Sequence, residues 1–183
     1  MCRKRARRLR VSTRSVWLGE IGRSGLSTYS ATICWSGSDP EAFAKGRYSR
    51  AHEWAFDGGA VVPASASPDN VPPGTADGAG VDPEEAFIAA ISSCHMLFFI
   101  DYARRAGFVV GSYVDEAAGI MEKNAAGKIA VTRVTLRPKV AFADPQPAPD
   151  AIADLHHRAH QDCFIANSIT TDVTVEHSPP PSC

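Results

Sequence analysis

Cys94 and Cys163 are the two residues in this sequence with the clearest capacity for chemistry. A cysteine thiolate can act as a nucleophile, a metal ligand or one half of a disulfide. Taken alone, each residue also has a structural explanation, because free cysteine is often buried and packs as a small hydrophobe. Cys94 lies on the apolar face of a predicted helix, and Cys163 lies near the end of another. The remaining cysteines are assigned no role: Cys2, Cys34 and Cys183.

The second predicted helix also offers a metal-binding alternative. His156, His160 and Cys163 are spaced i, i+4 and i+7, which places them on one helical face. Such a face can present zinc ligands, but no glutamate stands between the histidines as it does in His-Glu-x-x-His hydrolases. We therefore rank metal binding low. A cysteine hydrolase using Cys94 and His95 is weaker still, because adjacent helical residues point about 100° apart.

The composition is that of a soluble globular protein. The chain has 183 residues, 44% hydrophobic and 21% charged, with a formal net charge of −1. This length suits one compact domain, and the near-neutral charge does not suggest nucleic acid as a partner. No stretch of 18 apolar residues occurs, so we expect no membrane span. Five cysteines without regular spacing argue against a secreted disulfide framework, which makes the cytoplasm the expected location.

Charge is distributed unevenly along the chain. Residues 1–24 contain eight basic residues and one glutamate, a net charge of +7, and no apolar signal region follows them. We expect residues 1–27 to be a basic, disordered extension without a role in the chemistry. Residues 28–177 are the expected domain, and 178–183 form a polar, proline-rich tail.

The element best marked in the sequence is a helix that positions Cys94. Asp82 provides an N-cap, Pro83 suits the first helical position, and the acids that follow complete a capping-box pattern. Apolar residues then recur at three- and four-residue spacing until Gly107 ends the helix. The helix is apolar nearly all round, which predicts a central, buried position.

Shorter elements flank this helix. The sequence predicts a strand over 30–35, a hairpin over 51–62 and a long loop over 63–81. Further strands are expected over 113–121 and over 129–137, the latter continuing toward 142. A second helix over 149–163 and a strand over 169–175 follow. Because strands and helices occur in blocks, the predicted fold class is α+β.

Two segments resemble one protein family. Residues 82–94, DPEEAFIAAISSC, are similar to the opening of the central helix in the osmotically inducible protein C / organic hydroperoxide resistance (OsmC/Ohr) family. In that family the first reactive cysteine follows ten residues after a glutamate, as Cys94 follows Glu84. Residues 159–168, AHQDCFIANS, resemble the family's second cysteine segment. The resemblance covers roughly 28–177.

This sequence also departs from the family pattern in several places. Phe164 follows the second cysteine where proline is usual, and His95 and Met96 follow the first. Together with residues 48–54, these differences indicate a divergent branch. These differences leave both thiols intact, but they bear on which substrate the protein prefers.

The resemblance implies a fold and an activity. Antiparallel sheets would wrap around two central helices in an intertwined homodimer. The implied enzyme is a thiol-dependent peroxidase that reduces alkyl or lipid hydroperoxides without haem, metal or another bound cofactor. Cys94 would become a sulfenic acid, Cys163 would condense with it to a disulfide, and an external dithiol, possibly of lipoyl type, would restore both thiols.

Three further residues enter through the same resemblance. A thiol attacks a peroxide as its thiolate, which nearby positive charge favours. In the family an arginine provides that charge and the Pro-Glu glutamate holds it, so Glu84 matches by motif. Arg47 and Arg50 both remain candidates for the arginine, and the spacing from Glu84 favours Arg50. Ten helical residues separate Glu84 from Cys94 by about 15 Å, so a shared site would draw them from different subunits.

Three hypotheses thus remain. A thiol peroxidase is favoured over the other two. The runner-up is a stress-associated binding protein of the same fold with little turnover, because a shared fold does not fix an activity. A metal-binding protein using His156, His160 and Cys163 is third.

Overall fold

The computed structural model describes residues 27–143 and 146–176. Most of the expected N-terminal extension and the C-terminal tail lie outside the described residues. The elements confirm the α+β class, with mainly antiparallel strands and two long helices. The chain divides into two compact units, one ending at Val81 and the other beginning at Asp82. Each unit is described by itself.

The first unit is built on a three-stranded antiparallel sheet. Its order is β1 (Ala31–Cys34), β2 (His52–Phe56) and β3 (Val61–Ala64), which confirms the predicted strand and hairpin. A short helix, α1 (Pro40–Ala44), was not predicted from the sequence. The Asp39 carboxylate accepts hydrogen bonds from the first free backbone N–H groups of α1, as an N-cap does. The loop after β3 contains one 3₁₀ turn, η1 (Pro68–Asn70).

The second unit begins with the predicted long helix, α2 (Pro83–Arg105). The Asp82 carboxylate accepts from the backbone N–H of Glu85 at 2.7 Å, and the Glu85 carboxylate accepts from that of Asp82 at 3.2 Å. This reciprocal pair is the predicted capping box. Gly107 follows the C-cap with a φ of +84°, a left-handed conformation that glycine adopts without steric cost.

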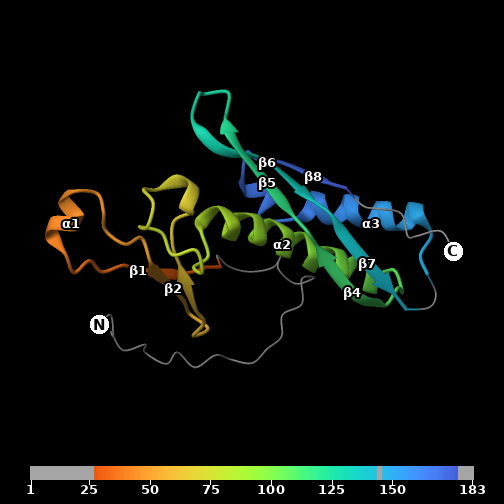
Figure 1. The fold of residues 1–183 in the computed structure, drawn as a ribbon. Helices are drawn as coiled ribbons and strands as arrows, with labels where there is room; N and C mark the ends of the chain where they lie inside the picture. Colours follow the sequence, from red (N-terminus) through yellow and green to blue (C-terminus); the bar gives the residue numbers. More distant parts are fainter. Residues whose placement is uncertain (1–26, 144–145, 177–183) are drawn as a thin grey trace. The chain divides into compact units, whose positions relative to one another are not determined.

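The central position predicted for α2 is also observed within this unit. The helix contacts α3 (Pro149–Asp162) and three of the strands, as Figure 1 shows. Among the described residues, α2 is the one helix long and apolar enough to cross a membrane by length and composition. The predicted burial is only partial, because α2 buries Ile91, His95, Phe98, Phe99 and Ala103 but leaves Leu97 and Ile100 exposed.

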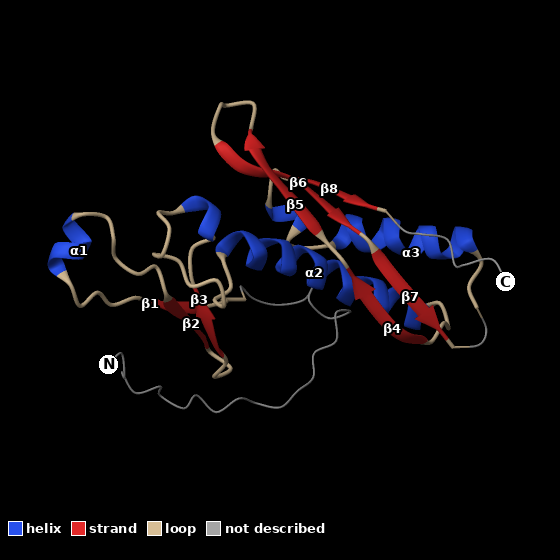
Figure 2. Ribbon diagram, viewed as in Figure 1, coloured by secondary structure: helices blue, strands red, loops and turns tan. Residues whose placement is uncertain are grey.

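The strands of this unit differ from the prediction in one respect. The predicted strand over 113–121 is two strands, β4 (Val110–Asp115) and β5 (Ala118–Lys123), and the following stretch is likewise β6 (Ile129–Leu136) and β7 (Pro138–Phe142). β4 pairs with β7 and β5 with β6, both antiparallel (Figure 2). The strand pairing is interrupted between β6 and β7 for two reasons. The Arg137 backbone N–H donates to the Asp115 carboxylate at 2.6 Å and not to a strand carbonyl. Pro138 has no N–H to donate.

The remaining elements close the core. Helix α3 confirms the predicted second helix, and the predicted final strand is β8 (Asp172–Val175), which runs parallel to β6. A 3₁₀ turn, η2 (Ala166–Ser168), lies between α3 and β8 in the chain. One core cluster joins α2 to the strands through its buried members Ile91, Val134, Leu136 and Val173. This packing holds the middle of α2, where Cys94 lies, in a fixed environment.

Candidate functional site

The structure brings the two predicted cysteines together between α2 and α3. Cys94 is half-buried on α2, whereas Cys163 forms the C-cap of α3 and is only 1% exposed. The Cys163 thiol interacts with the Cys94 side chain and lies 4.0 Å from the Ile91 carbonyl oxygen. Its sulfur accepts a hydrogen bond from the Ala166 backbone N–H at 3.4 Å. Both residues are free cysteines in this structure.

The environment keeps Cys163 protonated. Burial raises the pKa of the Cys163 thiol, and the neighbouring Cys94 raises it further, although the Ala166 N–H acts in the opposite direction. A buried, protonated thiol is a poor nucleophile toward a peroxide in solution. Of the two cysteines, the more exposed Cys94 is therefore better placed to meet a substrate first.

A pair of buried histidines also lies at the α2–α3 contact. Nε2 of His95, on α2, is 3.1 Å from Nδ1 of His156, on α3, and the rings are nearly parallel with centroids 5.4 Å apart. The side chains are 1% and 2% exposed, and the Phe99 ring stacks on His156 at 4.2 Å. Burial, together with the nearby His160, lowers the pKa of His95 from 6.5 to about 4. The His95 ring is therefore neutral near pH 7.

The metal-binding alternative finds no support in the geometry of the described residues. Within 27–143 and 146–176, no group of three His, Cys, Asp or Glu side chains is arranged to hold a metal ion. His156 and His160 share a helical face as predicted, but His156 directs Nδ1 at His95 of the other helix. The His95–His156 contact was not predicted, because helical spacing within one element cannot reveal a contact between residues 61 positions apart.

Aromatic contacts fix the chain around Cys163. The Phe164 ring, where the family usually has proline, packs edge-on against Phe98 with centroids 5.0 Å apart. Tyr102 donates a hydrogen bond to the Asp162 carboxylate, and the Arg158 guanidinium lies 4.4 Å from the Tyr102 ring centroid. The departure at Phe164 thus adds a further contact between α2 and the segment that leaves α3.

Glu84 lies in a different part of the second unit from the cysteines. It is half-buried at the start of α2 and lines a cleft of about 500 Å³ with residues from β6 and from the segment before β8. The lining residues, within the described chain, are Pro83, Glu84, Phe87, Ala130, Val131, Ser168, Ile169, Thr170 and Thr171. Cys94 is absent from this set. One chain therefore does not place Glu84 and Cys94 in the same cleft, as the helix geometry predicted.

The two candidate arginines belong to the first unit and differ in how firmly they are held. Arg47 is exposed. Arg50 is half-buried, and its guanidinium donates hydrogen bonds to the carbonyls of Tyr48 and, at 3.0 Å, of Gly46. Its central carbon also lies 3.8 Å from the Tyr48 ring centroid. Arg50 is thus the more ordered positive charge of the two.

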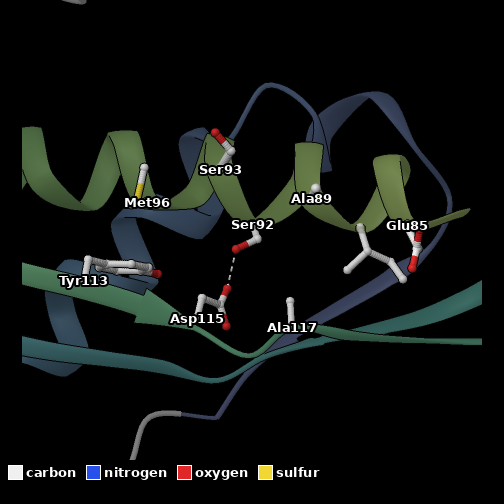
Figure 3. Close-up of a pocket in the computed structure, with 9 residues that line it drawn as sticks. Glu85, Ala89, Ser92, Ser93, Met96, Tyr113, Asp115 and Ala117 are labelled. Atoms are coloured by element: carbon white, nitrogen blue, oxygen red, sulfur yellow. Dashed lines mark hydrogen bonds between the residues drawn. The ribbon is translucent and has the colours of Figure 1, made fainter. Parts of the chain in front are cut away.

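A second cleft lies on another face of α2, between that helix and the strands, as Figure 3 shows. It has a volume of about 440 Å³, and the Ser92 hydroxyl donates to the Asp115 carboxylate across it at 2.5 Å. The Tyr113 hydroxyl is buried beside it without a hydrogen-bond partner among the described residues. Burial and then the charge of Asp115 raise the pKa of Tyr113, so the phenol stays protonated. The described residues lining this cleft include Ser93 and exclude Cys94.

The fold and the thiols define an α+β protein in which two cysteines meet between the central helix α2 and the end of α3. Residues 74–178 match the family described as OsmC-like protein, which is more than half of the chain. This chain belongs to the OsmC-like family, and the resemblance seen in the sequence is confirmed. No curated protein matches it.

Solved structures share this fold. An OsmC-like protein of unknown function from Vibrio cholerae O1 biovar eltor is 49% identical, with a TM-score of 0.81, over 84% of this chain and 100% of that one. The organic hydroperoxide resistance protein OhrB of Bacillus subtilis is 20% identical with a TM-score of 0.60, over 84% of this chain and 100% of that one. A similar protein from Elizabethkingia anophelis is 20% identical with a TM-score of 0.59, over 85% and 100% respectively. The last two likenesses establish the fold alone.

Proposed function

We propose that this protein is a cysteine-based organic hydroperoxide reductase in a peroxide-stress response. The observation that carries the proposal is the pairing of Cys94 and Cys163, two reduced thiols from different helices that interact at the α2–α3 contact. The fold shared with two organic hydroperoxide resistance proteins supports the same reading. Because the cycle must return to two thiols, a reducing compartment such as the cytoplasm suits it.

The reaction divides between the two cysteines according to their exposure. The half-buried Cys94, as thiolate, attacks the terminal oxygen of a hydroperoxide ROOH; the O–O bond breaks, the alcohol ROH leaves after protonation, and Cys94 becomes a sulfenic acid. The Cys163 thiol then attacks that sulfur, which releases water and forms the disulfide. An external dithiol, of lipoyl type by family resemblance, reduces the disulfide by two exchange steps and becomes oxidised itself. No metal or haem takes part in this cycle.

The activating charge is assigned to an arginine, with Glu84 as its anchor. Arg50 is favoured over Arg47, because its guanidinium is held by the carbonyls of Gly46 and Tyr48, whereas Arg47 is exposed. Glu84 and Cys94 lie about ten helical residues, or about 15 Å, apart on one helix. We therefore propose a homodimer in which each site takes Cys94 from one subunit and Glu84 from the other. The exposed apolar residues Leu97 (55%) and Ile100 (37%) on α2 suit a helix that packs against a second copy.

Thiol titration tests the proposal most simply. The accessible and total thiols of the purified protein are counted before and after one equivalent of cumene hydroperoxide. We expect two thiols to disappear and a dithiol to restore both, whereas Cys163→Ser should lose only one. Unchanged thiols with the hydroperoxide still present would overturn the proposal and favour a binding protein with little turnover.

A comparison of substrates tests its organic preference. Cumene hydroperoxide should react with Cys94 at least about tenfold faster than hydrogen peroxide, because an apolar substituent gains about 1.4 kcal/mol or more from burial against the helix. Equal rates for the two peroxides would contradict the organic preference while leaving the thiol chemistry in place.

A further inference from the structure

The buried pair of His95 and His156 is the most unusual polar feature of the α2–α3 contact. A hydrogen bond between two imidazoles needs a ring N–H on one side and a lone pair on the other. Such a bond is directional, whereas the apolar contacts around it are not. Apolar side chains of similar size would fill the same space without placing polar atoms in the core. The pair therefore adds a directional constraint to the packing of one helix on the other.

The position of the pair connects it to the thiols. His95 directly follows Cys94 on α2. His156 and Cys163 are seven residues apart along α3, which is about two helical turns and places them on the same face. Helix α3 thus meets α2 through polar contacts along its length: His156 bonds to His95, Tyr102 donates to Asp162, and Cys163 lies against Ile91 and Cys94. A rotation or shift of α3 that broke the first contact would also move the Cys163 sulfur.

We propose that His95 and His156 are positioning residues whose hydrogen bond holds α3 on α2 so that Cys163 stays within reach of Cys94. The inference rests on the proposed two-cysteine function. The histidines do not touch the reacting peroxide in this account. They act on the step in which the Cys94–Cys163 disulfide forms.

The bonded atoms give a sharp test, because the amides of glutamine and asparagine can replace different nitrogens of histidine. A glutamine amide lies close to the position of Nε2 and an asparagine amide close to that of Nδ1. His95 uses Nε2 and His156 uses Nδ1. His95→Gln and His156→Asn should therefore keep the hydrogen bond, whereas His95→Asn and His156→Gln should lose it.

The full chain is equilibrated with reduced and oxidised glutathione, and the fraction with the Cys94–Cys163 disulfide is measured by mass spectrometry. In this exchange two protein thiols reduce one oxidised glutathione to two reduced glutathiones. We expect the equilibrium constant for forming the disulfide to fall about tenfold or more when the bond is lost, which is about 1.4 kcal/mol. The two bond-keeping variants should stay within about threefold of the wild type.

A stability-matched control separates positioning from general loosening. Phe108→Ala removes the edge-on packing of Phe108 against Phe142, a contact that involves neither the histidines nor Phe99, so its disulfide constant should be unchanged at a similar loss of folding stability. Equal constants for all four histidine variants, or an equal fall in Phe108→Ala, would overturn the inference. The assay contains no peroxide, so it tests the positioning role separately from the peroxidase activity. If the wild-type protein does not react with cumene hydroperoxide, the proposed peroxidase activity is refuted. A difference in disulfide constant between the bond-keeping and bond-losing variants would still support the positioning role of His95 and His156.

Discussion

His95 should make the folded protein sensitive to mild acid. Its side chain is 1% exposed, and burial together with His160 lowers its pKa from 6.5 to about 4. The folded state therefore binds this proton more weakly than the unfolded state does. The stability tied to the neutral ring is fully present above pH 6.5 and is lost as the pH falls toward 4.

The size of the effect follows from the shift in pKa. A difference of 2.5 between 6.5 and 4 corresponds to about 3 kcal/mol of unfolding free energy lost between pH 7 and pH 4. About half of that loss, about 1.4 kcal/mol, should already be present at pH 5.5. His156, bonded to His95, and His160, which lies near it, are the titratable groups that face the ring.

Urea unfolding at fixed protein concentration measures this directly. The free energy of unfolding is determined at pH 7, 5.5 and 4 for the wild type and for His95→Gln, which cannot titrate. Other ionisable groups contribute alike to both proteins, so the wild type should lose about 3 kcal/mol more than the variant between pH 7 and pH 4. Parallel losses in the two proteins would refute the reasoning.

Three further predictions concern the arginines, the subunit arrangement and Phe164. Arg50→Lys should lower kcat/KM for cumene hydroperoxide about tenfold or more, because lysine lacks the planar, forked guanidinium of arginine. Arg47→Lys should change kcat/KM less than about twofold. The reverse ranking would assign activation of the Cys94 thiolate to Arg47. Equal mixtures of Cys94→Ser and Glu84→Ala subunits should regain about a quarter of wild-type activity, since half of the dimers would contain one intact shared site. No recovery after verified exchange would place the site within one subunit. Phe164→Ala should lower the free energy of unfolding by about 1 kcal/mol in urea titrations, through loss of its edge-on contact with Phe98; an unchanged midpoint would show that this contact is dispensable.

Local signals in the sequence predicted the elements that local chemistry controls. The capping pattern at Asp82 and the apolar spacing after it correctly placed α2, because an N-cap and a helical period need only neighbouring residues. The break in the strand over 113–121 was missed, because it depends on Asp115 accepting hydrogen bonds from Ser92 and Arg137, both far away in sequence. Tertiary contacts overrode a correct local preference there.

The residues of the candidate site likewise include some that the sequence predicted and some that it did not. The resemblance of two motifs singled out Cys94, which its pattern alone would have assigned to packing, and Cys163, for which the pattern alone favoured neither packing nor chemistry. The His95–His156 bond was not predictable, since it joins faces of two helices whose packing no single-helix pattern specifies. Histidines at i and i+4 on α3 suggested a metal instead, and only the position of α2 shows what His156 bonds to.

Disulfide mapping after a single turnover tests whether a hydroperoxide oxidises Cys94 and Cys163 to a disulfide with each other. The reduced full chain is treated with one equivalent of cumene hydroperoxide, the remaining thiols are blocked, and the digested peptides are identified by mass spectrometry. The account predicts one major cross-link, between the peptide carrying Cys94 and the peptide carrying Cys163, with cumyl alcohol formed in equal amount. Consumption of the hydroperoxide without that cross-link, or a cross-link that pairs either residue with Cys34, would contradict it.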